Sequence, residues 1–228
     1  MSHQPGTLLS PSSLAQQPPA AFSHKTVVCI GTGPSLTLEQ VETARQRGFV
    51  LTGCNNVFLD VPDLAVLYGC NFAWWCEYWG LVHKHPAEKW SSNWDAHQMF
   101  GINWISEKNA PGLSTDPTVI HHGHGSGFSL VNLVYLMGAE RIVLLGYDLR
   151  YSSDYDGRSC KIGSGPRHYF GEYPEGLRHW PSVHVRGGVH TELCELYRSV
   201  ADQDLIEVIN CTPDSALDCF QRMSIESV

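Results

Sequence analysis

The chain has 228 residues, of which 43% are hydrophobic and 17% charged, and its formal net charge is −8. This is enough apolar material for the core of one domain. An acidic surface does not attract phosphate backbones, so the composition disfavours nucleic acid as a partner.

No apolar run reaches the 18 residues that a membrane-spanning helix needs. Residues 1–24 are rich in Ser, Pro, Gln and Ala and lack the pattern of a signal peptide, so we predict a flexible N-terminal tail. The eight cysteines form no C-x-x-C pair, which favours a reducing, cytoplasmic location without disulfides. The sequence leaves open whether the chain forms a homo-oligomer.

The ordered domain is predicted over residues 25–228. A buried strand at 26–30 runs into a glycine-rich turn, and a helix at 37–47 and a strand at 49–54 follow. This order implies a parallel pair of strands joined by a crossover. A third strand is predicted at 63–68.

Residues 71–104 are rich in tryptophan, which either fills the core or forms a wall that binds an acceptor. Beyond them, further elements are predicted from apolar periodicity: a strand at 118–120, a helix at 128–137, a buried strand at 141–146, a helix at 191–202 and a strand at 206–210. The Gly- and Pro-rich segment 151–189 is predicted to be a lid or insertion. The fold class is therefore α/β, Rossmann-like, with a mostly parallel sheet, helices on both faces and a long lid.

The first candidate site is the turn after the first strand, formed by Gly31, Thr32, Gly33, Pro34 and Ser35. Glycines let a backbone approach a ligand closely, and amides at the start of the next helix attract anions. This predicts a phosphate-binding turn. A purely structural tight turn needs glycine as well, so the turn alone leaves both interpretations open.

Two further segments are candidate ligand contacts. Asn55 and Asn56 follow the second strand, where ligands of doubly wound sheets bind, although asparagines also cap turns. Ser126 and Gly127 precede the helix predicted at 128 and form a second candidate anion site. The neighbouring histidines, His121, His122 and His124, suit phosphate as well as a metal, and we predict no metal ligand among them.

Histidines of the lid are the candidate bases. His190 lies at the start of the last helix, where the helix dipole favours the neutral imidazole that a general base needs. His184 and His168 lie nearby in the sequence. Asp154 and Asp156 form a D-x-D pair, a pattern that also arises by chance in an acidic chain.

Several motifs, taken in order, resemble one superfamily over residues 26–225. It contains the bacterial lipo-oligosaccharide sialyltransferases, proteins similar to 6-hydroxymethylpterin pyrophosphokinase, and many phage proteins, to which the chain looks nearest. The motifs are the segments 28–36 (VCIGTGPSL), 54–56 (CNN), 126–127 (SG), 146–148 (GYD) and 209–217 (INCTPDSAL).

The resemblance implies roles for individual residues. In the sialyltransferases the glycine turn and the Cys-Asn motif bind the cytidine nucleotide, which implies this role for residues 31–36 and for Asn55. Their general base is a histidine just before the last helix, where His184 and His190 both lie. A histidine-rich motif of the phage proteins is similar to residues 168–174, in which His168 is retained.

The function expected from these observations is transfer of a sugar from a nucleotide-activated donor, for example one linked to CMP, with a histidine as general base. The alternatives are a pyrophosphokinase, in which Asp148 would help to hold Mg²⁺, and a non-catalytic module that binds or sequesters a nucleotide. No other cofactor is predicted.

Overall fold

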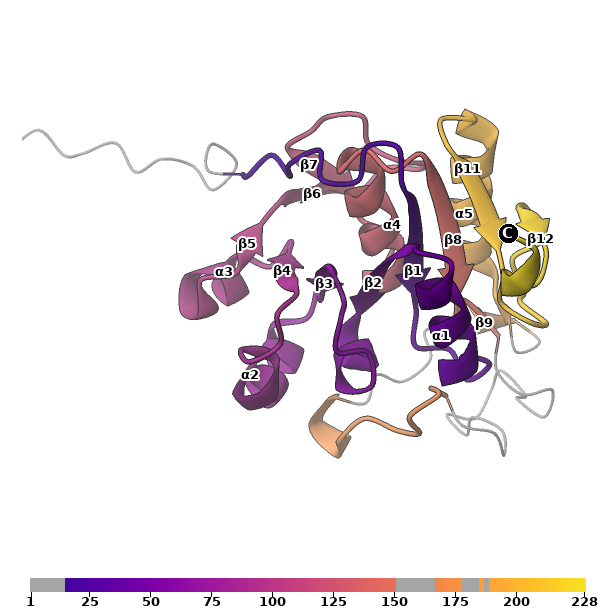
Figure 1. Cartoon of the computed structure of the whole chain (residues 1–228). Helices are drawn as coiled ribbons and strands as arrows, with labels where there is room; N and C mark the ends of the chain where they lie inside the picture. The colour runs from indigo at the N-terminus through magenta and orange to yellow at the C-terminus, as the bar shows by residue number, and fades with distance from the viewer. Residues whose placement is uncertain (1–14, 151–166, 178–184, 187–188) are drawn as a thin grey trace, which may run out of the picture.

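The computed structural model describes residues 15–150, 167–177, 185–186 and 189–228 (Figure 1). Within these ranges the strands form an eight-stranded sheet in the order β12-β11-β8-β1-β2-β3-β4-β5, with every neighbouring pair parallel. Its strands are β1 (Thr26–Ile30), β2 (Val50–Cys54), β3 (Val66–Tyr68), β4 (Glu88–Ser91), β5 (Asn103–Trp104), β8 (Arg141–Leu145), β11 (Glu207–Asn210) and β12 (Gln221–Arg222).

Helices connect these strands and cover the sheet. The α-helices are α1 (Leu38–Gln46), α2 (Phe72–Val82), α3 (Trp94–Phe100), α4 (Ser126–Leu136) and α5 (Thr191–Gln203). Helix α1 begins where predicted because Thr37 and Gln40 form a capping box, in which each side chain accepts the other residue's backbone N–H. Short 3-10 helices lie at η2 (Asn55–Leu59), η3 (Glu175–Leu177) and η4 (Ile225–Ser227).

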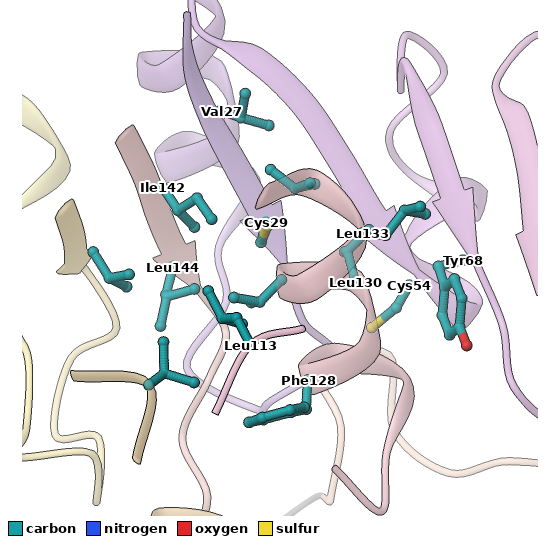
Figure 2. Packing of buried hydrophobic residues seen from close by; sticks show 14 of the residues in the cluster. Val27, Cys29, Cys54, Tyr68, Leu113, Phe128, Leu130, Leu133, Ile142 and Leu144 are labelled. Atoms are coloured by element: carbon teal, nitrogen blue, oxygen red, sulfur yellow. The ribbon is translucent and has the colours of Figure 1, made fainter. Parts of the chain in front are cut away.

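The core has two layers, one on each face of the sheet. Val27 and Cys29 of β1 point to the face that α4 covers, together with Ile142 and Leu144 of β8 (Figure 2). The alternate β1 residues, Val28 and Ile30, pack in the second cluster with residues of α1 and α2. Because β1 and β8 are buried on both faces, their sequences are continuous apolar runs. The parallel sheet with helices on both faces confirms the α/β prediction.

The strand order places a topological switch beside β1. The chain runs outward through β2, β3, β4 and β5, then returns to β8 on the other side of β1 and continues to β11 and β12. In doubly wound sheets ligands bind outside the carboxyl ends of the strands at such a switch. The fold therefore indicates a ligand site at the turns that follow β1, β2 and β8.

The region around α2 differs from the sequence prediction. Strand β3 begins at Val66 rather than at residue 63, and β4 was not predicted, because only its last two residues are buried. The tryptophans mainly fill the core. The most buried of them are Trp74, Trp75, Trp90 and Trp104. Two small sheets pair β6 (Ser106–Lys108) with β7 (Val119–His121), and β9 (Val185–Arg186) with β10 (Val189–His190).

The described part of the predicted tail packs on the domain. Phe22 is 4% exposed, and its backbone N–H donates to the Met137 carbonyl at 2.9 Å. The Gln16 side chain accepts the Trp104 N–H at 3.0 Å. The flexible tail predicted for residues 1–24 is therefore wrong for residues 15–24, because one buried ring and a few backbone bonds order a segment that has a single large apolar side chain. Residues 1–14 lie outside the described residues.

Candidate functional site

A cavity of about 360 Å³ lies at the carboxyl ends of β1, β2 and β8. The turn after β1, the start of α4 and the turn after β8 form part of its wall. Residues 167–177, which we call the strap, and the start of α5 form the rest. The predicted site residues that line it are Gly31, Thr32, Gly33, Pro34, Asn55, Ser126, Gly127, Asp148, His168 and His190.

The glycines of the first turn are required by packing against the turn after β8. The Gly31 N–H donates to the Leu145 carbonyl at 2.8 Å, and the Gly33 N–H donates to the Gly146 carbonyl at 2.9 Å. A Cβ at Gly31 or Gly33 would lie 2.6 Å from the Gly146 oxygen, and one at Gly33 would also overlap the Asp148 carboxylate. The structural interpretation therefore accounts for both glycines, although the turn they form still lines the cavity.

The Asp148 carboxylate closes this turn. Its Oδ1 accepts the Ser35 N–H at 3.1 Å, and its Oδ2 accepts the Ser35 hydroxyl at 2.9 Å. Burial raises the pKa of Asp148, and the hydrogen bonds from Ser35 oppose that shift. Ser35 does not line the cavity. Its side chain serves to hold Asp148 in place.

Helix α4 presents its first turn to the cavity. It begins at Ser126, two residues earlier than predicted, so Ser126 and Gly127 belong to its first turn. Gly125 is the N-cap, and as a glycine it has no side chain that could accept a hydrogen bond from the first turn. Amides of an uncapped first turn favour an anion through hydrogen bonds and through the helix dipole.

Asn55 and Ser126 lie side by side at the cavity. Asn55 has a left-handed backbone with φ of 50°, and its Oδ1 lies 3.1 Å from the Ser126 hydroxyl. That hydroxyl also accepts the Cys70 N–H at 3.2 Å. The turn after β2 is thereby tied to the start of α4.

The structure corrects the prediction for Asn56. This residue is 2% exposed and does not line the cavity. Its Oδ1 accepts the Trp74 indole N–H at 2.7 Å, and its Nδ2 donates to the Tyr78 hydroxyl at 3.0 Å. Asn56 therefore anchors α2 rather than a ligand.

The strap is the longest described part of the predicted lid, and hydrogen bonds tie it to the turns around the cavity. The Tyr169 N–H donates to the Thr32 carbonyl at 3.1 Å, and the Tyr169 hydroxyl donates to Asp60 Oδ2 at 2.9 Å. Arg167 and Glu172 form an ion pair at 3.5 Å and both line the cavity. His184 and the D-x-D pair at residues 154 and 156 lie outside the described residues.

Two candidate bases, His168 and His190, line the same cavity although they are 22 positions apart in the sequence. Burial lowers the pKa of both His168 and His190, so each is neutral near neutral pH. For His190 the direction agrees with the sequence prediction, and burial is its main cause. His190 is the N-cap of α5, and its backbone N–H donates to the Leu149 carbonyl at 3.0 Å.

The histidines before α4 lie in different surroundings. His124 lines the cavity, whereas the His121 Nδ1 contacts the carbonyl oxygens of Pro111 and Gly112 at 3.0 Å. Within the described residues, no three His, Cys, Asp or Glu side chains converge as a metal site would require. The described helices include none that is long and apolar enough to cross a membrane.

Sequence reasoning gave no role to Tyr147 or to the loop that braces it, although both lie within the motifs at residues 146–148 and 209–217. The Tyr147 hydroxyl donates to the Gly127 carbonyl at 3.1 Å, which fixes the start of α4 against the turn after β8. Thr212 Oγ1 accepts the Tyr147 N–H at 2.9 Å, and the Ser215 hydroxyl donates to the Tyr147 carbonyl at 2.6 Å. The motif at residues 209–217 was the sequence signal for this loop, and its residues Thr212 and Ser215 hold the Tyr147 backbone in place.

No family model matches the chain, and no curated protein matches it significantly. Among solved structures, the chain is similar to a Bacteroides thetaiotaomicron protein provisionally assigned as an epimerase. The two share 15% sequence identity, and the match covers 89% of this chain and 86% of the other with a TM-score of 0.31. This weak likeness adds nothing to the fold described above.

Proposed function

We propose that the chain binds a nucleotide in this cavity and transfers a group from it, with a neutral histidine as general base. One observation carries the proposal. The uncapped start of α4 and two histidines with lowered pKa line the same cavity, at the carboxyl ends of β1, β2 and β8. The first feature suits a phosphate, and the second suits removal of a proton.

The size and the charges of the cavity narrow the ligand class. Its volume of about 360 Å³ is near the lower end of ligand pockets, which suits a mononucleotide moiety better than a dinucleotide. Two arginines, Arg150 and Arg167, line its wall and could pair with a phosphate, although Arg167 also forms the ion pair with Glu172 and Asp148 lies on the same wall. The similarity of residues 31–36 and Asn55 to the sialyltransferase motifs favours a cytidine nucleotide, so we propose a CMP-linked sugar as donor.

The proposed step is attack of an acceptor hydroxyl on the sugar with departure of the nucleotide phosphate. The acceptor hydroxyl oxygen bonds to the anomeric carbon of the sugar, while the bond from that carbon to the phosphate oxygen breaks and its electron pair leaves with the phosphate. The hydroxyl proton passes to the neutral imidazole, which later releases it to water. Amides of the first turn of α4 would stabilise the charge on the departing phosphate, and the Ser126 hydroxyl would join them by exchanging its hydrogen bond to Asn55 Oδ1 for one to the phosphate.

The two alternatives make different demands on the site. A pyrophosphokinase would hold Mg²⁺ with carboxylates such as Asp148. Both oxygens of Asp148 are occupied by Ser35, so magnesium would have to displace or share those hydrogen bonds. A binding module would use the same cavity without turnover.

A thermal-shift screen with mononucleotides, CMP-linked sugars and ATP, each with and without Mg²⁺, tests the proposal. At 100 times Kd a ligand stabilises the folded state by about 2.7 kcal/mol, which corresponds to a Tm increase of roughly 5–10 °C for a domain of this size. We expect that increase with CMP or a CMP-linked sugar in the absence of metal, together with release of CMP when an acceptor is supplied. ATP binding that requires Mg²⁺ would instead favour the pyrophosphokinase, and binding without turnover would favour the module.

A further inference from the structure

A tight turn in the strap places two opposite charges side by side. The Gly171 N–H donates to the His168 carbonyl at 2.9 Å, and these two residues form an antiparallel bridge. Gly171 has a positive φ of 94°, which glycine adopts without strain. The residues that flank this bridge are Arg167 and Glu172, which form an ion pair and both line the cavity. The turn therefore presents a paired cation and anion to the ligand site.

This pair is looser than other arginine–carboxylate pairs of the described residues. Arg167 Nε lies 3.5 Å from Glu172 Oε2, whereas three other pairs have N–O distances of 2.6 or 2.7 Å. These pairs are Arg45–Asp63, Arg141–Glu207 and Arg198–Asp218. Yet the Arg167 side chain is only 15% exposed, against 37% or more for the other three arginines. A cation withdrawn from water needs a close anion, so a better-placed anion can replace Glu172.

The two partners differ in how firmly they are held. The strap is fixed to the glycine turn directly after Arg167, since the Tyr169 N–H donates to the Thr32 carbonyl at 3.1 Å and Thr32 Oγ1 lies 3.1 Å from His168 Nδ1. Glu172 lies beyond the turn, and its side chain is 39% exposed. Its carboxylate can rotate into water and regain hydration there, while the arginine stays at the cavity wall.

We propose that this ion pair is exchangeable: the anionic group of the ligand takes the place of Glu172 as the partner of Arg167. The inference rests on the proposed function and deepens it, because it makes Glu172 a specificity-determining residue. An uncharged nucleoside cannot replace a carboxylate beside a guanidinium, so Glu172 favours nucleotides over nucleosides by competing for Arg167. Arg167 then contributes to binding only for ligands that carry the anion.

The test is a double-mutant cycle of Glu172→Gln and Arg167→Gln, with inorganic phosphate followed by thermal shift and with CMP and cytidine followed by calorimetry. We expect Glu172→Gln to bind phosphate and CMP about fivefold more tightly than wild type, and Arg167→Gln about fivefold more weakly, which is near the upper end for a partly exposed ion pair. Cytidine should bind wild type and Glu172→Gln alike. In the Arg167→Gln background the gain from Glu172→Gln should be clearly smaller, because no guanidinium is released.

Glu175→Gln is the matched control. It removes the same charge from an exposed position of the strap that does not line the cavity, and it should change phosphate and CMP affinity by less than about twofold. A pair that only stabilises the turn predicts weaker binding in both single variants. Unchanged or weaker anion binding by Glu172→Gln would therefore overturn the inference, even if Arg167→Gln failed to fold. Strictly additive effects in the cycle would overturn it as well, because Glu172 would then only repel the anion.

The same measurements separate the inference from the proposed function. If CMP does not bind while phosphate affinity follows the two substitutions as expected, nucleotide binding fails and the exchange at Arg167 stands. If CMP binds wild type and all variants equally, the exchange fails and nucleotide binding stands. No response to phosphate or CMP in any variant would overturn both.

Discussion

Gly33→Ala should destabilise the fold itself. The new Cβ would overlap the Asp148 carboxylate and lie 2.6 Å from the Gly146 oxygen, so Asp148 must move. Its two hydrogen bonds to Ser35 would then be lost or weakened, and hydrogen bonds to charged groups contribute about 1.5–3 kcal/mol each. Since Ser35 and Asp148 can partly recover by bonding to water, we expect a net loss of about 3 kcal/mol, equivalent to a Tm decrease of roughly 6–12 °C.

The assay is urea unfolding of the single variants and of a double-mutant cycle with Asp148→Ala. Removing the carboxylate removes one of the two collisions, so Gly33→Ala should cost at least about 1 kcal/mol less in that background. Gly125→Ala is the matched control, because a Cβ at Gly125 meets no atom within 4 Å and its φ of −174° suits any residue. A Gly33→Ala variant within about 0.5 kcal/mol of wild type, or strictly additive effects in the cycle, would refute the packing argument.

Three further predictions concern stability. Gly80→Ala should raise the free energy of unfolding by about 0.5–1 kcal/mol in the same urea assay, because Gly80 lies within α2 and its added Cβ meets nothing; no gain would contradict this. Phe22→Ala, or deletion of residues 1–22, should lower the Tm, since loss of a buried phenylalanine costs about 3–5 kcal/mol. An unchanged Tm would instead support the flexible tail that the sequence predicted. Acidification below pH 6.5 should lower the Tm, because the unfolded chain binds protons that the buried His168 and His190 resist. That decline should be smaller in His168→Gln, and an identical pH profile would count against its burial.

The central part of the fold could be predicted because its signals are local. The buried runs of β1 and β8 and the capping box at Thr37 reflect periodicity and capping, which short segments carry by themselves. Strand β4 and the packing of Phe22 depend on contacts with distant segments, and each of these segments has a single large apolar side chain, Trp90 or Phe22. They were missed for that reason.

The candidate site was predicted in outline rather than in detail. The rule that ligands bind at the carboxyl ends of parallel strands singled out the turn after β2, and the structure adds that Asn55 of this turn contacts Ser126. It could not show that Asn56 turns inward to Trp74, because adjacent residues of a tight turn point in different directions. Nor could it show that Gly33 faces Asp148, a residue 115 positions away.

Calorimetric titration of CMP into wild type, Gly125→Asp and Gly125→Asn tests most directly whether the start of α4 holds the ligand's phosphate. Both side chains can cap α4, both have open space, and they differ only in charge. A carboxylate near a bound phosphate costs on the order of 1–4 kcal/mol at separations of about 4 Å. We predict that CMP affinity falls by about tenfold or more in Gly125→Asp relative to Gly125→Asn, while both variants melt close to wild type. Equal CMP affinities in the two variants would contradict a phosphate site at α4.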